Sequence, residues 1–211
     1  MAADPEVFPN CEFWLVRHAE TEWNQAARWQ GHADPELSAR GRRQADALAD
    51  RMAEDPEATD LGPLLCSDLS RSLATATALG RRLGLEPETD PRLRELDIGE
   101  WSGCVREEIE ARDGDLLVRF DAEEPDARPP GGETRREIRE RAHAVMSEFA
   151  QRYAESRILI VTHTGLIRAL LPGVDLRNAE LLRVAADDAL TRRLRSQGGG
   201  SAAGGGDGAL W

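Results

Sequence analysis

The sequence has few aromatic residues, no long apolar run and no excess of positive charge, and each shortage excludes a class of protein. Aromatic residues make up 5% of the 211 residues, so aliphatic side chains must form the core. No apolar run reaches the roughly 18 residues of a membrane-spanning helix, and the N-terminus lacks the basic and apolar regions of a signal peptide. The net charge of −12 argues against nucleic acid or an anionic membrane as a partner. A small anionic substrate is compatible with this net charge, because a positively charged pocket can form on an acidic protein.

Cysteine is equally scarce. Cys11, Cys66 and Cys104 lie far apart and form no closely spaced pair. A disulfide framework or a zinc site would need paired spacing. We therefore predict a cytoplasmic protein with structural thiols, no bound metal and no cofactor. Cys66, inside an apolar run, is expected to be buried and inert.

Three short apolar runs end in residues that are suited to phosphate. They are residues 13–16 before Arg17 and His18, residues 64–66 before Ser67, Asp68 and Arg71, and residues 158–162 before His163. Short aliphatic runs followed by helical patterns are typical of buried strands in a parallel sheet. Ligands of such sheets bind beyond the carboxyl ends of the strands. The sequence therefore predicts that two histidines and two arginines meet at one sheet edge, in a site for a phosphoryl group.

The order of patterns predicts an α/β fold with a mostly parallel sheet. We expect strands over residues 13–18, 61–66, 158–162 and, at an edge, 181–185, and helices over about 38–53, 70–83, 134–155 and 165–171. Ser38 is a predicted N-cap, and Gly84 a predicted left-handed C-cap. Residues 91–95 are expected to approach the sheet again.

Two segments stand apart from this pattern. Residues 101–130 hold nine acidic residues against four arginines and are predicted to be a short, partly helical insert over the strand edge. From residue 196 the composition becomes rich in Gly, Ser and Ala, which cannot bury enough apolar surface to become ordered. We therefore predict one catalytic domain over residues 1–195, with the insert at 101–130, and a flexible tail over 196–211.

Six ordered motifs resemble those of the histidine phosphatase superfamily, in its phosphoglycerate-mutase-like branch. They are Arg17-His-Ala-Glu-Thr21, Gln30-Gly-His-x-Asp34, Ser67-Asp-Leu-Ser-Arg71, Arg94-Glu-Leu-Asp-Ile-Gly-Glu-Trp-Ser-Gly103, Pro130-Gly-Gly-Glu-Thr134 and Val161-Thr-His-Thr-Gly165. A lone Arg-His pair would mean nothing, but the match runs in order from about residue 13 to 171. The resemblance implies a three-layer α/β/α sandwich whose short insert covers the active site.

The resemblance also assigns roles to residues. It implies a phosphohistidine on His18, with the phosphate held by Arg17, Arg71 and His163 and with Glu95 as general acid and base. We also expect one ring nitrogen of His18 to be tied to a backbone carbonyl. The further phosphate- or substrate-binding candidates are Asn24, Gln30, Gly31 and Thr164.

Several of these assignments have a plainer alternative. Asp97 and Glu100 lie near Glu95, which could be an ordinary surface carboxylate, and Asn24 could be a turn residue. Residues 30–32 fit a surface loop as well as a substrate contact. The tryptophans that either wall the pocket or belong to the core are Trp23, Trp29 and Trp101.

Departures from the family pattern favour hydrolysis over phosphoryl isomerisation. Ala19 and Thr164 replace glycines beside the phosphate; both are small, so we expect these two departures to be tolerated without loss of activity. Cofactor-dependent mutases of the family typically carry Asn where this chain has Gly165, and they have a longer, more basic insert. The acidic insert here works against binding a second anion.

We predict a metal-independent phosphatase of a small phosphorylated metabolite. The alternatives are a phosphoglycerate mutase and a regulatory or protein-directed phosphatase. An edge at 181–186 would allow a homodimer.

Overall fold

The computed structural model describes residues 10–191; the predicted glycine-rich tail and the predicted domain ends lie outside them. Its strands are β1 Glu12–Arg17, β2 Leu61–Cys66, β3 Pro87–Thr89, β4 Arg157–Thr162 and β5 Leu181–Ala185. Its α-helices are α1 Glu22–Gln25, α2 Ala39–Ala53, α3 Ser70–Leu83, α4 Arg106–Asp121, α5 Arg135–Arg152, α6 Thr164–Leu170 and α7 Ala186–Thr191. Single 3₁₀ turns are η1 Pro56–Asp60, η2 Pro91–Leu93 and η3 Gly99–Trp101.

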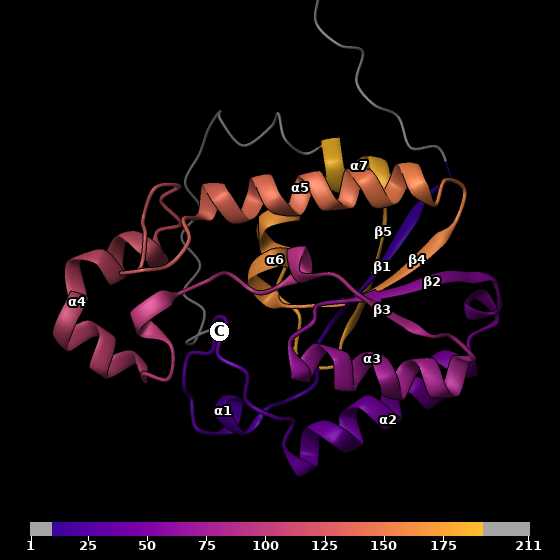
Figure 1. The fold of residues 1–211 in the computed structure, drawn as a ribbon, viewed down its shortest axis with the longest axis horizontal. Helices are drawn as coiled ribbons and strands as arrows, with labels where there is room; N and C mark the ends of the chain where they lie inside the picture. The colour runs from indigo at the N-terminus through magenta and orange to yellow at the C-terminus, as the bar shows by residue number, and fades with distance from the viewer. Residues whose placement is uncertain (1–9, 192–211) are drawn as a thin grey trace, which may run out of the picture.

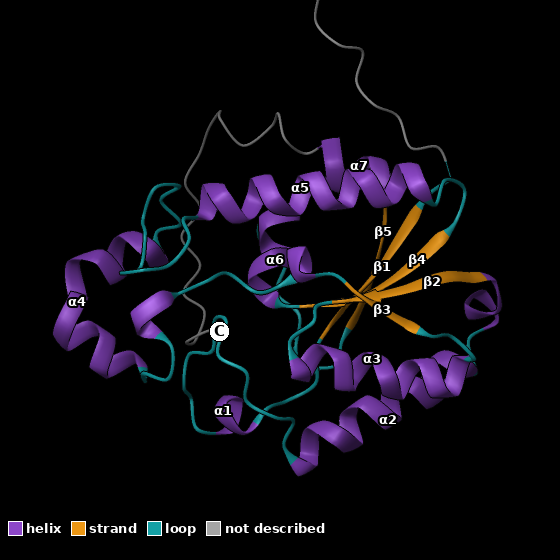
Figure 2. Cartoon of the chain, in the orientation of Figure 1, coloured by secondary structure: helices purple, strands orange, loops and turns teal. Residues whose placement is uncertain are grey.

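The strands form one sheet in the order β3-β2-β4-β1-β5 (Figure 2). β1, β2, β3 and β4 are parallel, and β5 pairs antiparallel with β1. The predicted mostly parallel sheet and its final edge strand are confirmed. β3 was not predicted: residues 87–89, rather than 91–95, pair with β2, and such a short edge strand shows no apolar alternation.

Helices cover both faces of the sheet, which confirms the three-layer sandwich. α5, α6 and α7 lie on one side, and α2 and α3 lie on the other (Figure 1). Successive β1 residues alternate between the two resulting cores: Phe13 and Leu15 pack in the core that contains α5, and Trp14 and Val16 pack in the core that contains α2 and α3. Because both faces are buried, the central strands are apolar throughout, which is why they are recognisable in the sequence.

The ends of the helices follow the predicted capping signals. The Ser38 hydroxyl accepts the Gly41 amide at 2.9 Å at the start of α2. α3 ends at Gly84, whose φ of 73° lies in the left-handed region. Thr134 caps α5 and forms a capping box with Glu137.

The insert is partly helical, as predicted, with α4 over residues 106–121, and it lies beyond the end of the sheet (Figure 1). Trp29, Trp101 and Phe120 pack together, with Trp101 and Phe120 ring centroids 5.3 Å apart. Trp29 is 3% exposed and Trp101 is fully buried, so both belong to the core rather than to a pocket wall. Across residues 10–191, no helix has the length and apolarity needed to cross a bilayer.

Candidate active site

Two histidines meet at the carboxyl ends of the central strands. His18 follows β1 and His163 follows β4, and their ring centroids lie 5.1 Å apart. The His18 amide donates to the Thr162 carbonyl at 2.9 Å, which holds the two strand ends together. Both side chains are buried, at 3% and 0% exposure. Adjacent parallel strands therefore bring together residues that are far apart in the sequence.

The hydrogen bond of the His18 ring fixes its tautomer. Nδ1 lies 2.7 Å from the Ala19 carbonyl oxygen, which can only accept, so Nδ1 carries the proton. Nε2 is then left with its lone pair. Burial, and next the charges of Arg71 and Arg17, hold the pKa of His18 well below its usual value. The ring is therefore neutral at physiological pH and has one nucleophilic nitrogen.

His163, like His18, is buried beside a positive charge, but its ring makes no hydrogen bond to a described residue. Both of its ring nitrogens are buried without a hydrogen-bond partner among the described residues. Burial, followed by the charge of Arg71, lowers its pKa well below the usual value. A buried polar group without a partner is costly, so its presence suggests a ligand that is bound there during function.

Arg71 is fully buried at the start of α3. Its two terminal nitrogens donate to the carbonyls of Ala33 and Gly31 at 2.7 and 2.8 Å. Each of these nitrogens carries two hydrogens, so one on each stays available to a ligand. Burial lowers the pKa of Arg71 to about 10, which leaves it charged at neutral pH. Arg71 therefore presents a fixed, planar cation beside both histidines.

Arg17 provides the second cation. One of its terminal nitrogens donates to the Leu176 carbonyl at 2.7 Å, and the side chain is 7% exposed. Burial lowers its pKa, and the charge of Glu95 opposes that shift. The electrostatic effects of Arg17 on His18 and of Glu95 on Arg17 place these groups in one cluster. The predicted set of two arginines and two histidines thus converges.

Glu95 lines a pocket together with His18 and Arg71. The pocket is lined by His18, Gln30, Gly31, Arg71, Glu95, Leu96 and Ile98. The Glu95 carboxylate accepts the amide of Leu96 at 2.8 Å, and the residue is 8% exposed. Neither Asp97 nor Glu100 lines this pocket. Of the three neighbouring carboxylates, Glu95 is therefore the one positioned to exchange a proton with a bound ligand.

The loop that carries Glu95 is held by two side chains with no predicted role in positioning it. Arg141 of α5 donates to the carbonyls of Arg92, Arg94 and Glu95 at 2.8 to 3.2 Å, and Glu133 binds its guanidinium at 2.8 Å. His32 Nε2 donates to the Glu95 carbonyl at 2.8 Å. Glu133 lies in the Pro-Gly-Gly-Glu motif, and His32 in the Gln-Gly-His motif. Arg141 has no sequence signal beyond its place on an amphipathic helix.

The remaining predicted residues lie around this core in different ways. Asn24 is bound to Thr21 in the capping box of α1, as a turn residue would be. Gln30 accepts a bond from Thr21 and lines the pocket. Gly31 lines it too and holds Arg71 through its carbonyl. Thr164 Oγ1 is buried and has no partner among the described residues.

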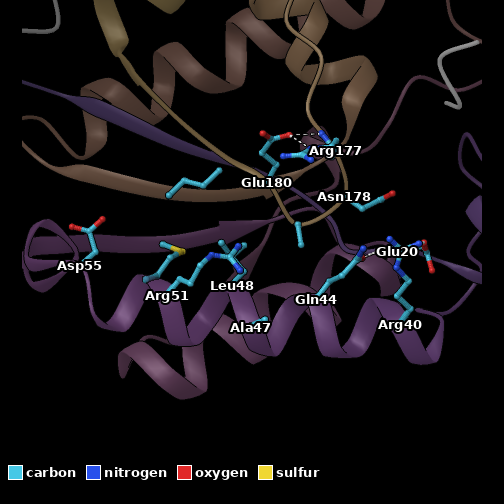
Figure 3. A pocket seen from close by; sticks show the side chains of 13 residues that line it. Glu20, Arg40, Gln44, Ala47, Leu48, Arg51, Asp55, Arg177, Asn178 and Glu180 are labelled. Atoms are coloured by element: carbon cyan, nitrogen blue, oxygen red, sulfur yellow. Dashed lines mark hydrogen bonds and ion pairs between the residues drawn. The ribbon is translucent and has the colours of Figure 1, made fainter. Parts of the chain in front are cut away.

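A larger cavity, of about 900 Å³, lies elsewhere, between α2 and residues 177–181 (Figure 3). Its lining is mixed in charge, and Arg177 pairs with Glu180 and Arg40 with Glu20. No histidine lines it. Asn178, which also lines it, donates to the His18 carbonyl at 3.1 Å. This cavity thus lacks His18 and Arg71, which line the pocket that contains Glu95.

Metal-ligating side chains and the Cys66 thiol are the remaining groups that could take part in chemistry. Within residues 10–191 no set of three or more His, Cys, Asp and Glu side chains is arranged to hold a metal ion. Burial raises the pKa of Cys66 to about 12, with Asp68 adding to the shift. The expectation that this thiol is buried is confirmed, and its raised pKa disfavours the reactive thiolate.

Comparisons with known proteins agree with this geometry. The model of "Histidine phosphatase superfamily (branch 1)" matches residues 13–203. Phosphoserine phosphatase 1 of Hydrogenobacter thermophilus is 34% identical over 165 residues, 77% of this chain and 76% of the relative. Glucosyl-3-phosphoglycerate phosphatase of Mycolicibacterium vanbaalenii is 38% identical over 168 residues, 74% and 70% of the two chains. A structure of mycobacterial glucosyl-3-phosphoglycerate phosphatase with VO3 covers 82% of this chain and 90% of that one, at 30% identity and a TM-score of 0.73. The chain belongs to branch 1 of the histidine phosphatase superfamily and is a phosphatase of that superfamily.

Proposed function

We propose that this phosphatase hydrolyses small phosphorylated metabolites without a metal, through a phosphohistidine on Nε2 of His18. The observation that carries the proposal is the bond from Nδ1 to the Ala19 carbonyl, which leaves Nε2 as the nucleophile of a neutral ring. Arg17 and Arg71 supply the positive charge that a metal provides in other phosphatases.

In the first step, the Nε2 lone pair of His18 attacks phosphorus and the bond from phosphorus to the leaving oxygen breaks. Glu95 gives its proton to that oxygen, so the product leaves as a neutral alcohol. Arg71 and Arg17 neutralise the equatorial oxygens, and the ring N–H of His163, which has no partner among the described residues, donates a further hydrogen bond to them.

In the second step, Glu95, now a carboxylate, takes a proton from a water molecule. The water oxygen attacks phosphorus, the bond to Nε2 breaks and inorganic phosphate leaves. His18 returns to its neutral state, with the proton still on Nδ1. The enzyme is regenerated, and neither step needs an additional reactant.

The relatives support a small-molecule substrate. Their names describe phosphatases of phosphoserine and of glucosyl-3-phosphoglycerate, both small phosphorylated metabolites. Gly165 and the short insert argue for hydrolysis rather than isomerisation. We therefore infer a phosphomonoester of this kind as the substrate.

The test is phosphate release from a panel of phosphomonoesters by EDTA-treated protein, with isomerisation of 3-phosphoglycerate measured in parallel. We expect release to survive EDTA and to vanish in His18→Ala. Rapid acid-free denaturation during turnover, followed by mass spectrometry, should place a phosphoryl group on His18 in the wild type. In His163→Ala we expect slower release and the same labelled residue.

Three outcomes would overturn the proposal. If EDTA abolished the activity and added metal restored it, the reaction would depend on a metal ion rather than on the charge of the arginines. Full activity of a folded His18→Ala protein, checked by circular dichroism, would exclude the nucleophile. Isomerisation of 3-phosphoglycerate without phosphate release would make the protein a mutase.

A further inference from the structure

Residues 30–34 lie between the phosphate-binding part of the site and the general acid, and we call them the bridging loop. On one side this loop holds Arg71, whose guanidinium donates to the carbonyls of Gly31 and Ala33. The Asp34 carboxylate also accepts the amide of the first α3 residue at 2.7 Å. The bridging loop is therefore attached to the helix that presents the phosphate-binding arginine.

The same loop packs against the segment that carries the general acid. Gly31 has a φ of 50°, and a Cβ atom on it would lie 2.4 Å from Cγ1 of Ile98. Glycine therefore allows the backbone of the bridging loop to approach this segment closely. The two segments are in direct contact at the level of the backbone.

His32 provides a polar contact between these two segments. Its Nε2 donates to the Glu95 carbonyl at 2.8 Å, and its Nδ1 lies 3.6 Å from Oδ2 of Asp97. Arg141 donates to the same Glu95 carbonyl at 3.2 Å. A carbonyl oxygen has two lone pairs, so it can accept both donors. The backbone of the general acid is thus held from α5 by one donor and from the bridging loop by the other.

We propose that His32 is a positioning residue that sets the place of the general acid relative to the bound phosphate. This inference rests on the proposed function, because it needs Glu95 as the proton donor. The bond from His32 ties the Glu95 backbone to the loop whose carbonyls hold Arg71. The carboxylate and the guanidinium then keep one spacing, which protonation of the leaving oxygen requires. His32 does not line the histidine pocket, so it acts through Glu95.

The test compares two substrates that differ in how much protonation the leaving oxygen needs. One is the alkyl phosphate that the wild type hydrolyses fastest in the substrate panel, and the other is p-nitrophenyl phosphate, whose leaving group needs little protonation. We expect His32→Leu to lower kcat/KM about tenfold to a hundredfold for the alkyl phosphate and far less for p-nitrophenyl phosphate. Inhibition by inorganic phosphate should be unchanged, because backbone carbonyls still hold Arg71.

Two further variants show which contact of His32 matters. His32→Gln should restore most of the lost activity, because its amide nitrogen can take the place of Nε2 and donate to the Glu95 carbonyl. The matched control is Asp97→Asn, which changes the group that faces Nδ1 and leaves the bond from Nε2 in place. We expect this control to match the wild type on both substrates.

A double-mutant cycle with Glu95→Gln shows whether His32 acts through the general acid. Once an amide replaces the carboxylate, residue 95 supplies no proton to the leaving oxygen. Adding His32→Leu should then lower kcat/KM for the alkyl phosphate no further. A structural role alone would lower it by the same factor with and without the carboxylate.

The outcomes distinguish failure of this inference from failure of the proposed function. The positioning role is wrong if His32→Leu matches the wild type, if it slows both substrates equally, or if it slows Glu95→Gln further. Full activity of Glu95→Gln on the alkyl phosphate would instead remove the general acid, and the proposed function would fail together with the inference. Hydrolysis of p-nitrophenyl phosphate reports on the His18 chemistry and on folding in every variant.

Discussion

Gly165, near the start of α6, lies directly against the Glu95 carboxylate: a Cβ atom on Gly165 would lie 2.2 Å from Oε1 of Glu95. Because the atom in the way is the tip of a flexible side chain, Gly165→Ala should displace the carboxylate and leave the fold intact. Positioned acid catalysis is typically worth about 10²–10⁴-fold. We expect kcat for alkyl phosphates to fall about tenfold to a hundredfold, with the melting temperature nearly unchanged.

The leaving group provides the control for the Gly165→Ala variant. A p-nitrophenolate needs little protonation, so its release should fall far less than that of an alkoxide. Equal losses for p-nitrophenyl phosphate and for an alkyl phosphate would contradict displacement of the acid and would indicate a disturbed phosphate site instead.

Arg141 is predicted to be a positioning residue for the general acid. It joins α5 to three carbonyls of the Glu95 loop and is itself held by Glu133. Arg141→Met removes these bonds together, so the loop loses its support. We expect kcat for alkyl phosphates to fall by about tenfold or more while KM changes little. Steady-state kinetics on an alkyl phosphate and on p-nitrophenyl phosphate measure this split.

Arg152→Met, on the same helix, is the matched control for Arg141→Met. Its side chain is exposed and only loosely paired with Glu88, at 3.5 Å. We expect it to match the wild type. Arg141→Lys should recover only part of the activity that Arg141→Met loses, because one ammonium group cannot reach all three carbonyls. A purely structural role would lower thermal stability in Arg141→Met and spare the leaving-group dependence.

Much of the fold was predictable from the sequence because its signals are local. The strands β1, β2 and β4 are buried on both faces and are therefore apolar runs, and the capping residues Ser38 and Gly84 mark helix ends. The histidines and arginines were predicted to meet because each lies at, or a few residues after, the carboxyl end of a strand. β3 shows no such signal, since Pro87, Glu88 and Thr89 form a short, partly exposed edge strand.

The supports of the site were not predictable, because they are side chains that bind distant backbone carbonyls. Arg141 lies 46 residues from Glu95, and helical periodicity reports only which face is buried.

The N-cap residue Ser38 tests whether a capping signal that is visible in the sequence stabilises the fold. Its hydroxyl accepts the Gly41 amide and donates to the buried Glu20 carboxylate at 2.8 Å. Ser38→Ala removes both bonds, and we expect the free energy of unfolding to fall by about 1–2 kcal/mol. Urea denaturation measures the change. Thr77→Ala, at an exposed position of α3, is the control; equal destabilisation by the two substitutions would contradict the capping role.

The two buried histidines predict that the protein loses stability in mild acid. In the unfolded chain a histidine has a pKa near 6.5, whereas burial holds the pKa of His18 and His163 well below that value in the fold. Below about pH 6.5 the unfolded state therefore binds protons that the folded state does not. The free energy of unfolding should fall with pH in this range, by up to about 1.4 kcal/mol per pH unit for each histidine, and these groups should add no slope above about pH 7.5.

Replacing one histidine isolates its share of this slope. Carboxylates contribute similarly to the wild type and to His163→Gln, so the difference between their curves belongs to His163. Urea unfolding at pH 7 and at pH 5.5 should show the variant losing less stability than the wild type. Parallel curves would mean that the folded protein takes up a proton at His163 as readily as the unfolded chain does. The neutral, ligand-ready state inferred for the site would then be wrong, because a protonated ring would already be present before phosphate binds.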